Sequence, residues 1–177
     1  MISKKMEAAL NQQIAFEGYA SFLYLSMATW CGAKGLKGCT HFLHRQSGEE
    51  HKHMLKIFEY LSDVDGFALT PGISEPPREF ESVQSVFKLV YEHEQKVTKS
   101  INGLLTLANK ENDYSTQTFL LWYVTEQREE EALMRTVLDR ISLIGTGPQN
   151  LYFIDKEMEA INKATTTAGA AGGEAAA

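Results

Sequence analysis

The chain has 177 residues, of which 44% are hydrophobic and 10% aromatic, enough for one globular domain with a buried core. Its formal net charge is −6 and it has no block of Lys and Arg, so we expect cations rather than nucleic acid as partners. It lacks the apolar run of a signal peptide and the roughly 20 apolar residues that span a bilayer. Cys31 and Cys39 are too few for a disulfide framework, so we expect a cytoplasmic protein without a membrane partner.

The first expected helix runs from Ser3, its N-cap, to about Gly32, and apolar residues recur along one of its faces at the helical period. Glu17 interrupts this face between Ile14 and Tyr24. A buried carboxylate is unfavourable unless it is paired or bound to a metal. Glu17 therefore either needs a cation beside it or lies at the edge of the face and reaches solvent.

The second expected helix runs from about Lys37 to Asp63 and follows a short Gly-rich turn, which predicts that it is antiparallel to the first. Near its middle, Glu50 and His53 stand three residues apart, so their side chains share one face and can bind one ion. A Glu-x-x-His unit, with glutamates projecting from other helices, is typical of di-iron four-helix bundles. One such unit also occurs by chance on exposed helices, so partners must be found elsewhere in the chain.

Residues 64–81 contain Pro71, Pro76 and Pro77 and cannot continue a helix. Extended, this segment reaches up to ~60 Å, whereas the second helix is roughly 40 Å long. The segment can therefore run the length of the bundle and place the third helix parallel to the second. A single long crossover of this kind is a known four-helix topology.

The third expected helix covers about residues 82–109, with Glu94 among its inner apolar residues and with Glu92 and His93 on its solvated face. The fourth follows a turn capped by Asp113 and ends at about residue 143. Its expected core positions are Phe119, Trp122, Tyr123, Leu133, Val137 and Ile141. Between them stand Glu126, Gln127, Glu129 and Glu130, while Glu131 is expected to be a solvated charge.

Each of the four helices thus carries an acid at mid-length on its apolar face. Carboxylates with a single imidazole suit iron or manganese, and crowded carboxylates in a dry core repel one another and favour two cations. We therefore expect a dinuclear centre, with iron as its metal.

These residues give the sequence a close resemblance to the ferritins, in particular the non-haem bacterial type, over about residues 1–162. The resemblance rests on Glu17 with Tyr24, Glu49-Glu50-x-x-His53, His93-Glu94-Gln95, Trp122-Tyr123-Val124-x-Glu126-Gln127-x-Glu129-Glu130 and Leu151-Tyr152-Phe153-Ile154-Asp155. It implies an all-α, ferritin-like four-helix bundle with one long crossover between helices two and three and a short fifth C-terminal helix.

The resemblance also implies a ferroxidase centre in which Glu17, Glu50 and His53 hold one iron. Glu50 would bridge to a second iron held with Glu94, near two residues of the fourth helix, Gln127 and Glu130. Gln127 stands where bacterioferritin-like proteins have a Glu, so the second iron should be held more weakly.

A third iron site, typical of the bacterial branch, would use Glu49, Glu126, Glu129 and Glu130. Tyr24 matches the family's tyrosine that can supply an electron to reduced oxygen, or it is a packed phenol bonded to a carboxylate. The haem-binding type has a methionine between the positions of Glu50 and His53, which this chain lacks, so we do not predict haem. Gln117 and Leu120 replace acids that line the threefold channels of animal ferritins, which leaves the iron entry route open.

We expect residues 1–145 to form the bundle, 146–163 the fifth helix and 164–177 a flexible Ala/Gly-rich tail. The fifth helix contains Leu151, Tyr152, Phe153, Ile154 and Ile161, which have no obvious place in a closed four-helix core. By resemblance it packs at the fourfold axis of a hollow shell of 24 identical subunits; the alternative is that it folds back onto its own bundle.

The function implied is iron storage, with oxidation of Fe(II) by O₂ or H₂O₂ and deposition of ferric mineral inside the shell. Two alternatives remain open. One is a soluble di-iron oxidase or peroxide-detoxifying enzyme without bulk storage. The other is a non-catalytic helical assembly protein whose central carboxylates only hold a structural ion.

Overall fold

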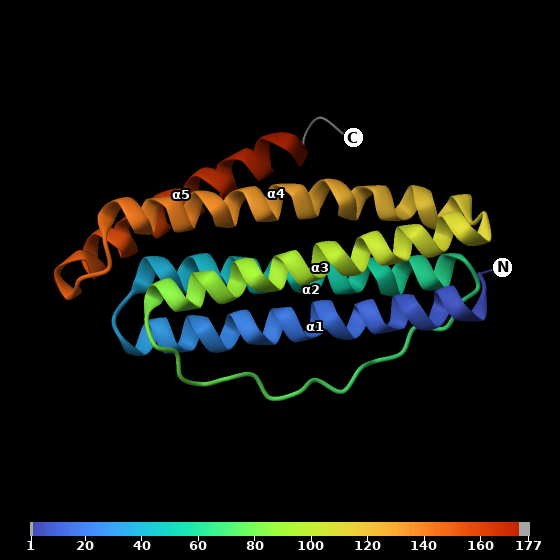
Figure 1. Ribbon diagram of the computed structural model, residues 1–177, viewed down its shortest axis with the longest axis horizontal. Coiled ribbons are helices and arrows are strands. Elements are labelled where there is room, and N and C mark those ends of the chain that lie inside the picture. The colour runs from blue at the N-terminus through green and yellow to red at the C-terminus, as the bar shows by residue number, and fades with distance from the viewer. Residues whose placement is uncertain (1, 174–177) are drawn as a thin grey trace.

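The computed structural model describes the backbone of residues 2–173 and the side chains of residues 2–165. Over that range the chain forms helices and no strand, which confirms the all-α fold class (Figure 1). The helices are α1 (Lys4–Ala33), α2 (Lys37–Asp63), α3 (Val83–Glu111), α4 (Tyr114–Ile144) and α5 (Leu151–Gly173), with a 3-10 turn, η1 (Pro148–Asn150), before α5. None of the helices in this range is both long and apolar enough to cross a membrane.

Polar side chains cap α1, α3 and α4 where the sequence predicts their starts. The hydroxyl of Ser3 accepts a hydrogen bond from the backbone N–H of Met6 at the start of α1. Ser82 forms a capping box at the start of α3, and Asp113 caps α4. Asn112 ends α3 in the left-handed conformation, with φ of 55°, which turns the chain directly into α4.

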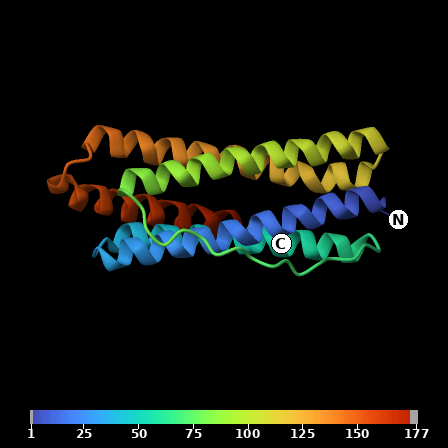
Figure 2. The ribbon, with the colours of Figure 1, turned by 60° about the horizontal axis from the view of Figure 1, so that its bottom comes forward.

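The segment between α2 and α3 runs along the outside of α1 for most of the bundle's length (Figures 1 and 2). Near one end the Asn11 side chain bonds to the backbone of Phe67 and Leu69, at 2.9 and 2.6 Å. Near the other end the Ser26 hydroxyl donates to the carbonyl oxygen of Pro77 at 2.5 Å. The crossover places α3 parallel to α2, as the length of this proline-containing segment predicts (Figure 1).

The interior consists of two apolar clusters, one toward each end of the bundle, with polar residues between them. One cluster includes Tyr24, Phe42, Phe87 and Val137, and the other includes Leu10, Ile57, Ile101 and Tyr123. The buried polar residues between them come from all four long helices. Apolar packing therefore supplies the stability at both ends and leaves the middle for charged groups.

Trp122 is a correction to the expected core of α4, because it is 39% exposed. Its indole packs against the His53 ring, with centroids 5.4 Å apart, and Lys56 lies over the indole. The helical period places Trp122 beside Tyr123, which is fully buried, so only one of the two neighbours can face the interior.

Helix α5 folds back on its own subunit and packs mainly against α2. Ile154 and Met158 are buried there, so part of the apolar side is covered within the chain, as in the alternative that the sequence left open. Tyr152 and Phe153 remain 63% and 59% exposed. The helix continues past residue 163 to Gly173, through part of the expected tail, and residues 174–177 lie outside the described range.

Gly38 allows α2 and α5 to approach closely, because a Cβ at this position would overlap the carbonyl oxygen of Asp155. We expect Gly38→Ala to push α5 outward and to cost about 1 to 3 kcal/mol, as overpacking does. Faster hydrogen exchange in α5 and a lower melting temperature would show this. Gly48→Ala, also on α2, is the matched control, because the added Cβ would meet no described atom within 4 Å. If both variants behave alike, close packing at Gly38 is not what holds α5.

Candidate metal centre

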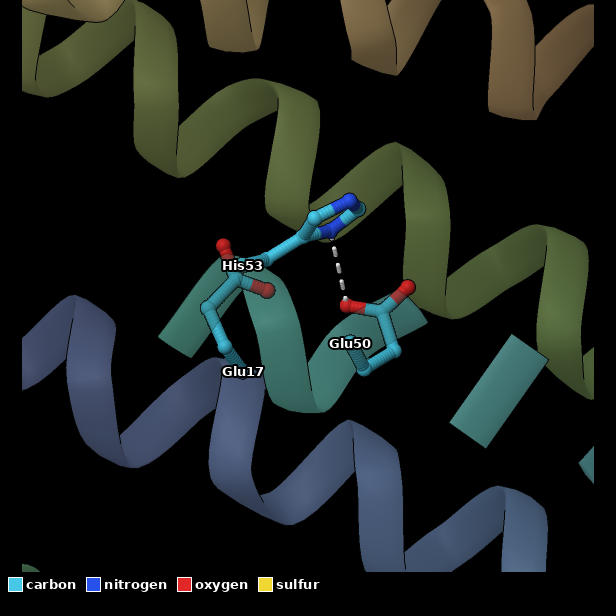
Figure 3. Close-up of side chains that lie close together, drawn as sticks. All are labelled: Glu17, Glu50 and His53. Carbon is cyan, nitrogen blue, oxygen red and sulfur yellow. Dashed lines mark ion pairs between the residues drawn. The ribbon is translucent and has the colours of Figure 1, made fainter. Parts of the chain in front are cut away.

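Glu17 of α1 and the Glu50–His53 pair of α2 meet inside the bundle (Figure 3). Each offers one ligand atom, and these atoms all lie within 4.8 Å of one another. Glu17 and Glu50 are fully buried and His53 is 3% exposed. His53 Nδ1 lies 3.4 Å from Glu50 Oε2, which follows from their spacing of three on one helix. For Glu17 the sequence left two possibilities, a buried position beside a cation or a position that reaches solvent. The structure places Glu17 in the interior.

The other two helices bring one acid each, and each acid is held by a neutral donor. Tyr24 of α1 donates a short hydrogen bond from its hydroxyl to Glu94 Oε1 of α3. Gln46 of α2 donates from Nε2 to Glu130 Oε2 of α4 at 2.8 Å. Glu94 is fully buried and Glu130 is 5% exposed. Four helices therefore contribute carboxylates to one water-poor region.

Several ligand atoms in this region have no hydrogen-bond partner among the described residues. They are Glu17 Oε2, both carboxylate oxygens of Glu50, Glu94 Oε2 and His53 Nδ1. Buried carboxylate oxygens without donors are costly, and a bound cation removes that cost. Oxygen ligands with one imidazole are the donors that iron and manganese accept. The residues present therefore fit a metal site of the predicted kind.

Burial raises the pKa of the clustered carboxyls, because it penalises their charged forms. The pKa of Glu94 rises to about 8 through burial and the nearby charge of Glu130. The pKa of Glu130 rises to about 7 through burial and the charge of Glu49. The pKa values of Glu17 and Glu50 are raised as well, chiefly by burial. Without a cation the folded chain holds protons at these sites, so metal ions and protons compete for them.

His53 responds to the same carboxyls in the opposite sense. Burial alone lowers its pKa, but the nearby carboxyls of Glu126 and Glu50 outweigh burial and raise it to about 11. A metal bound by Nδ1 must displace that proton, so metal affinity is expected to increase with pH.

The predicted ligands of the third site lie less close together. Apart from Glu130, Glu126 approaches the centre, with Oε1 3.8 Å from His53 Nε2. Glu49 is tied to Arg45 by two hydrogen bonds of 2.8 and 2.6 Å. The Glu129 side chain is 66% exposed and lies 3.8 Å from Arg128. Of the four predicted acids, Glu130 alone is buried, and Glu129 points toward the surface of the subunit.

A groove of about 390 Å³ lies between α2 and α4. Its lining includes His53, Glu126, Trp122, Lys52 and Lys56. Since His53 belongs to both the buried cluster and this groove, the groove reaches the edge of the centre.

Two polar residues that support the proposed ligands were not predicted from the sequence. Gln13 donates from Nε2 to Glu17 Oε1 at 2.9 Å, and Ser100 donates to Gln13 Oε1 at 2.5 Å. Gln13 stands four residues before Glu17, so helical spacing could have indicated it. Ser100 lies on another helix, and no feature of its local sequence marks it.

His93 is a correction, because it is 5% exposed rather than solvated. Its ring packs against Phe16, Tyr19 and Tyr24, with centroids 4.8, 6.1 and 6.0 Å away. Burial and the charge of Lys96 lower its pKa to about 4, so it is neutral at pH 7. Because aromatic residues of α1 cover His93, the buried face of α3 includes one residue more than the apolar pattern of α3 alone predicts.

Comparison with known proteins agrees with this arrangement. Residues 7–144 match the family model described as the ferritin-like domain. The chain belongs to the ferritin family. Its fold is also that of solved ferritins: an open-pore ferritin from the archaeon Archaeoglobus fulgidus superposes with a TM-score of 0.86 at 43% identity, over 89% of this chain and 96% of that one.

Within that family, the chain is similar to curated bacterial non-heme ferritins. It is 44% identical to the one from Campylobacter jejuni over 91% of this chain and 96% of the relative. It is 39% identical to the one from Escherichia coli O6:H1 over 92% and 98%, respectively. The predicted resemblance to non-haem bacterial ferritins is confirmed, and an iron-storage ferritin is the class of protein that fold and relatives support.

Proposed function

We propose that this chain stores iron in the cytoplasm by oxidising Fe(II) with O₂ or H₂O₂ at a ferroxidase centre in each subunit and depositing ferric mineral in a hollow shell. The convergence of buried carboxylates from all four long helices, with oxygens left unpartnered beside His53, carries this proposal. Fe(II) is the substrate, and the first iron binds to Glu17, Glu50 and His53.

Glu50 suits the role of a ligand shared by two irons, because neither of its carboxylate oxygens has a hydrogen-bond partner among the described residues. The second iron binds to Glu94 and Glu130, with Gln127 beside it. Carboxylates favour the higher charge of Fe(III) over Fe(II), so the site lowers the free-energy cost of electron transfer to the oxidant. Protons displaced from the carboxyls by Fe(II) leave to solvent when the metal binds.

Tyr24 is placed to give an electron to the oxidant and its phenolic proton to Glu94. Its hydroxyl already donates a hydrogen bond to Glu94 Oε1, so the proton has an acceptor when the electron leaves. Burial and the neighbouring carboxylates raise the pKa of Tyr24, which keeps the phenol protonated until then.

The third iron site, formed by Glu49, Glu126, Glu129 and Glu130, lies on the way to storage. The groove between α2 and α4 supports this, since it joins His53 and Glu126 to the surface of the subunit. Threefold channels of the animal type are not part of the proposal, because Leu120 is buried in the core and carries no charge.

Assembly into a shell of 24 subunits is supported by the apolar side chains that α5 leaves exposed. Tyr152 and Phe153 stay largely exposed although the neighbouring Ile154 is buried. Neighbouring copies of α5 at a fourfold axis would cover these rings and release the water that now contacts them.

Fe(II) added without oxygen and then exposed to air separates storage from the alternatives. We expect rapid oxygen uptake and retention of many iron atoms per chain after a chelator wash and gel filtration. The iron count distinguishes the readings, because a di-iron oxidase without a storage cavity stops at two or three atoms. Absence of iron-dependent oxygen uptake would support the assembly protein and contradict the proposal.

A further inference from the structure

Gln127 is the one neutral side chain among the predicted iron ligands, and the usefulness of its amide depends on which end faces the metal. A carbonyl oxygen binds a cation, whereas the NH₂ group repels it. In the structure Gln127 is 1% exposed, its Oε1 lies 3.2 Å from Thr98 Oγ1 of α3, and its Nε2 is buried without an acceptor among the described residues.

Thr98 can supply only one proton, and a stronger acceptor competes for it. Its Oγ1 also lies 2.6 Å from Glu131 Oε1, a distance typical of a hydroxyl that donates to a carboxylate. Glu131 Oε2 in turn lies 3.4 Å from the Arg135 guanidinium, and a carboxylate oxygen can only accept hydrogen bonds. The Thr98 proton therefore belongs to Glu131, and the longer contact with Gln127 leaves Thr98 as an acceptor.

An acceptor at Thr98 needs the NH₂ end of the Gln127 amide. Rotation of the amide by a half turn about its last bond satisfies both groups: Nε2 donates to Thr98, and Oε1 faces the interior where Nε2 has no acceptor. With a cation bound beside Glu94 and Glu130, the interior end then carries an oxygen ligand instead of an unpaired donor.

We infer that Thr98 and Glu131 are positioning residues that orient the Gln127 amide and so turn it into a ligand of the second iron. Glu131 takes the Thr98 proton, Thr98 accepts from Gln127 Nε2, and Gln127 presents its oxygen to the metal. Glu131 is thus part of the centre's support, although its sequence position indicates a solvated charge. The inference rests on the proposed dinuclear centre.

Calorimetric titration of the metal-free protein with Co(II), which needs no oxidation, tests the inference apart from activity. We expect at least two binding events per chain in the unaltered protein, of which the first two fill the dinuclear centre. Thr98→Val keeps the shape and charge of the residue but removes the acceptor. It should weaken the second event 10- to 100-fold, as loss of a partner outside the coordination shell does, and leave the first unchanged.

Thr98→Ser should restore the second event, because it returns the hydroxyl. Thr106→Val is the matched control on α3, since the Thr106 hydroxyl bonds only its own helix backbone at Asn102 and is exposed. Equal affinities in Thr98→Val and the unaltered protein would overturn the inference, as would a Thr98→Ser variant as weak as Thr98→Val.

Glu131→Gln tests the other half of the relay, because a neutral amide at 131 can donate to Thr98 and release the Thr98 proton toward Gln127 Oε1. The second event should again weaken selectively. Glu92→Gln, which removes the same charge from an exposed pair with Lys88, should change both events little. Equal weakening of both events by Glu131→Gln would show a charge effect and contradict the relay. Fewer than two events in the unaltered protein would instead overturn the dinuclear proposal, and this inference with it.

Discussion

Replacing Glu50 with Ala is expected to slow rapid Fe(II) oxidation at least about 100-fold while leaving the fold and assembly intact. Loss of a partner outside a metal's coordination shell already costs 10- to 100-fold, and Glu50 is proposed to bind both irons directly. The fold should tolerate the change, because neither carboxylate oxygen of Glu50 receives a hydrogen bond that the variant would forfeit. Stopped-flow absorbance of ferric product, with gel filtration for assembly, measures both effects.

Glu92→Ala provides the comparison for Glu50→Ala. It removes a carboxylate of the same size, but one that is 44% exposed and 3.9 Å from Lys88. We expect unchanged oxidation in this control. If Glu50→Ala oxidises Fe(II) at the normal rate, the buried cluster is not the ferroxidase centre; if it loses its assembled form, the rate cannot be assigned to the lost ligand.

Most residues of the centre that could be predicted from the sequence were predicted from helical periodicity. Glu17, Glu50 and Glu94 each stand on the apolar face of a long helix, and a helix fixes which residues share a face. Because adjacent helices in a bundle are antiparallel or joined by a crossover of known reach, acids at mid-length must meet. This argument needs no knowledge of side-chain packing, and all three acids are buried in the structure.

The residues that support the ligands depend instead on how one helix is rotated and shifted against the next. Thr98 and Ser100 matter because of Gln127 and Gln13 on other helices, and the spacing within α3 carries no trace of those partners. The burial of His93 likewise depends on the aromatic residues of α1. Helix α5 can pack closely on α2 because Gly38 has no side chain. In the sequence, a glycine at this position is equally typical of an ordinary turn.

The buried carboxyls also make the stability of the metal-free protein depend on pH. Glu94 and Glu130 have ordinary pKa values of 4.5 and folded-state values of about 8 and about 7, so above pH 4.5 the folded state holds more protons than the unfolded state. The free energy of unfolding therefore falls as pH rises through these values. His53, raised from 6.5 to about 11, acts in the same direction above pH 6.5.

His93 opposes this trend only at lower pH. Its pKa is lowered from 6.5 to about 4, so the unfolded state binds its proton more readily between these values, and stability from this group rises until about pH 6.5. Between pH 6.5 and 8 the carboxyls and His53 act without that opposition. The two carboxyls alone then lower the free energy of unfolding by about 2 kcal/mol.

The melting temperature of the metal-free protein should therefore fall by at least about 4 °C between pH 6.5 and 8, for a chain of this size. Glu94→Gln, which removes a titrating carboxyl, should flatten the profile. Saturating Co(II) should stabilise the protein more at pH 8 than at pH 6.5, since the ion no longer competes with protons for the same oxygens. A melting temperature that rises with pH over this interval, or stabilisation by Co(II) that weakens, would mean that the carboxyls are ionised in the metal-free fold. The centre would then be held open by charge repulsion, and the cation would not be needed to remove protons from it.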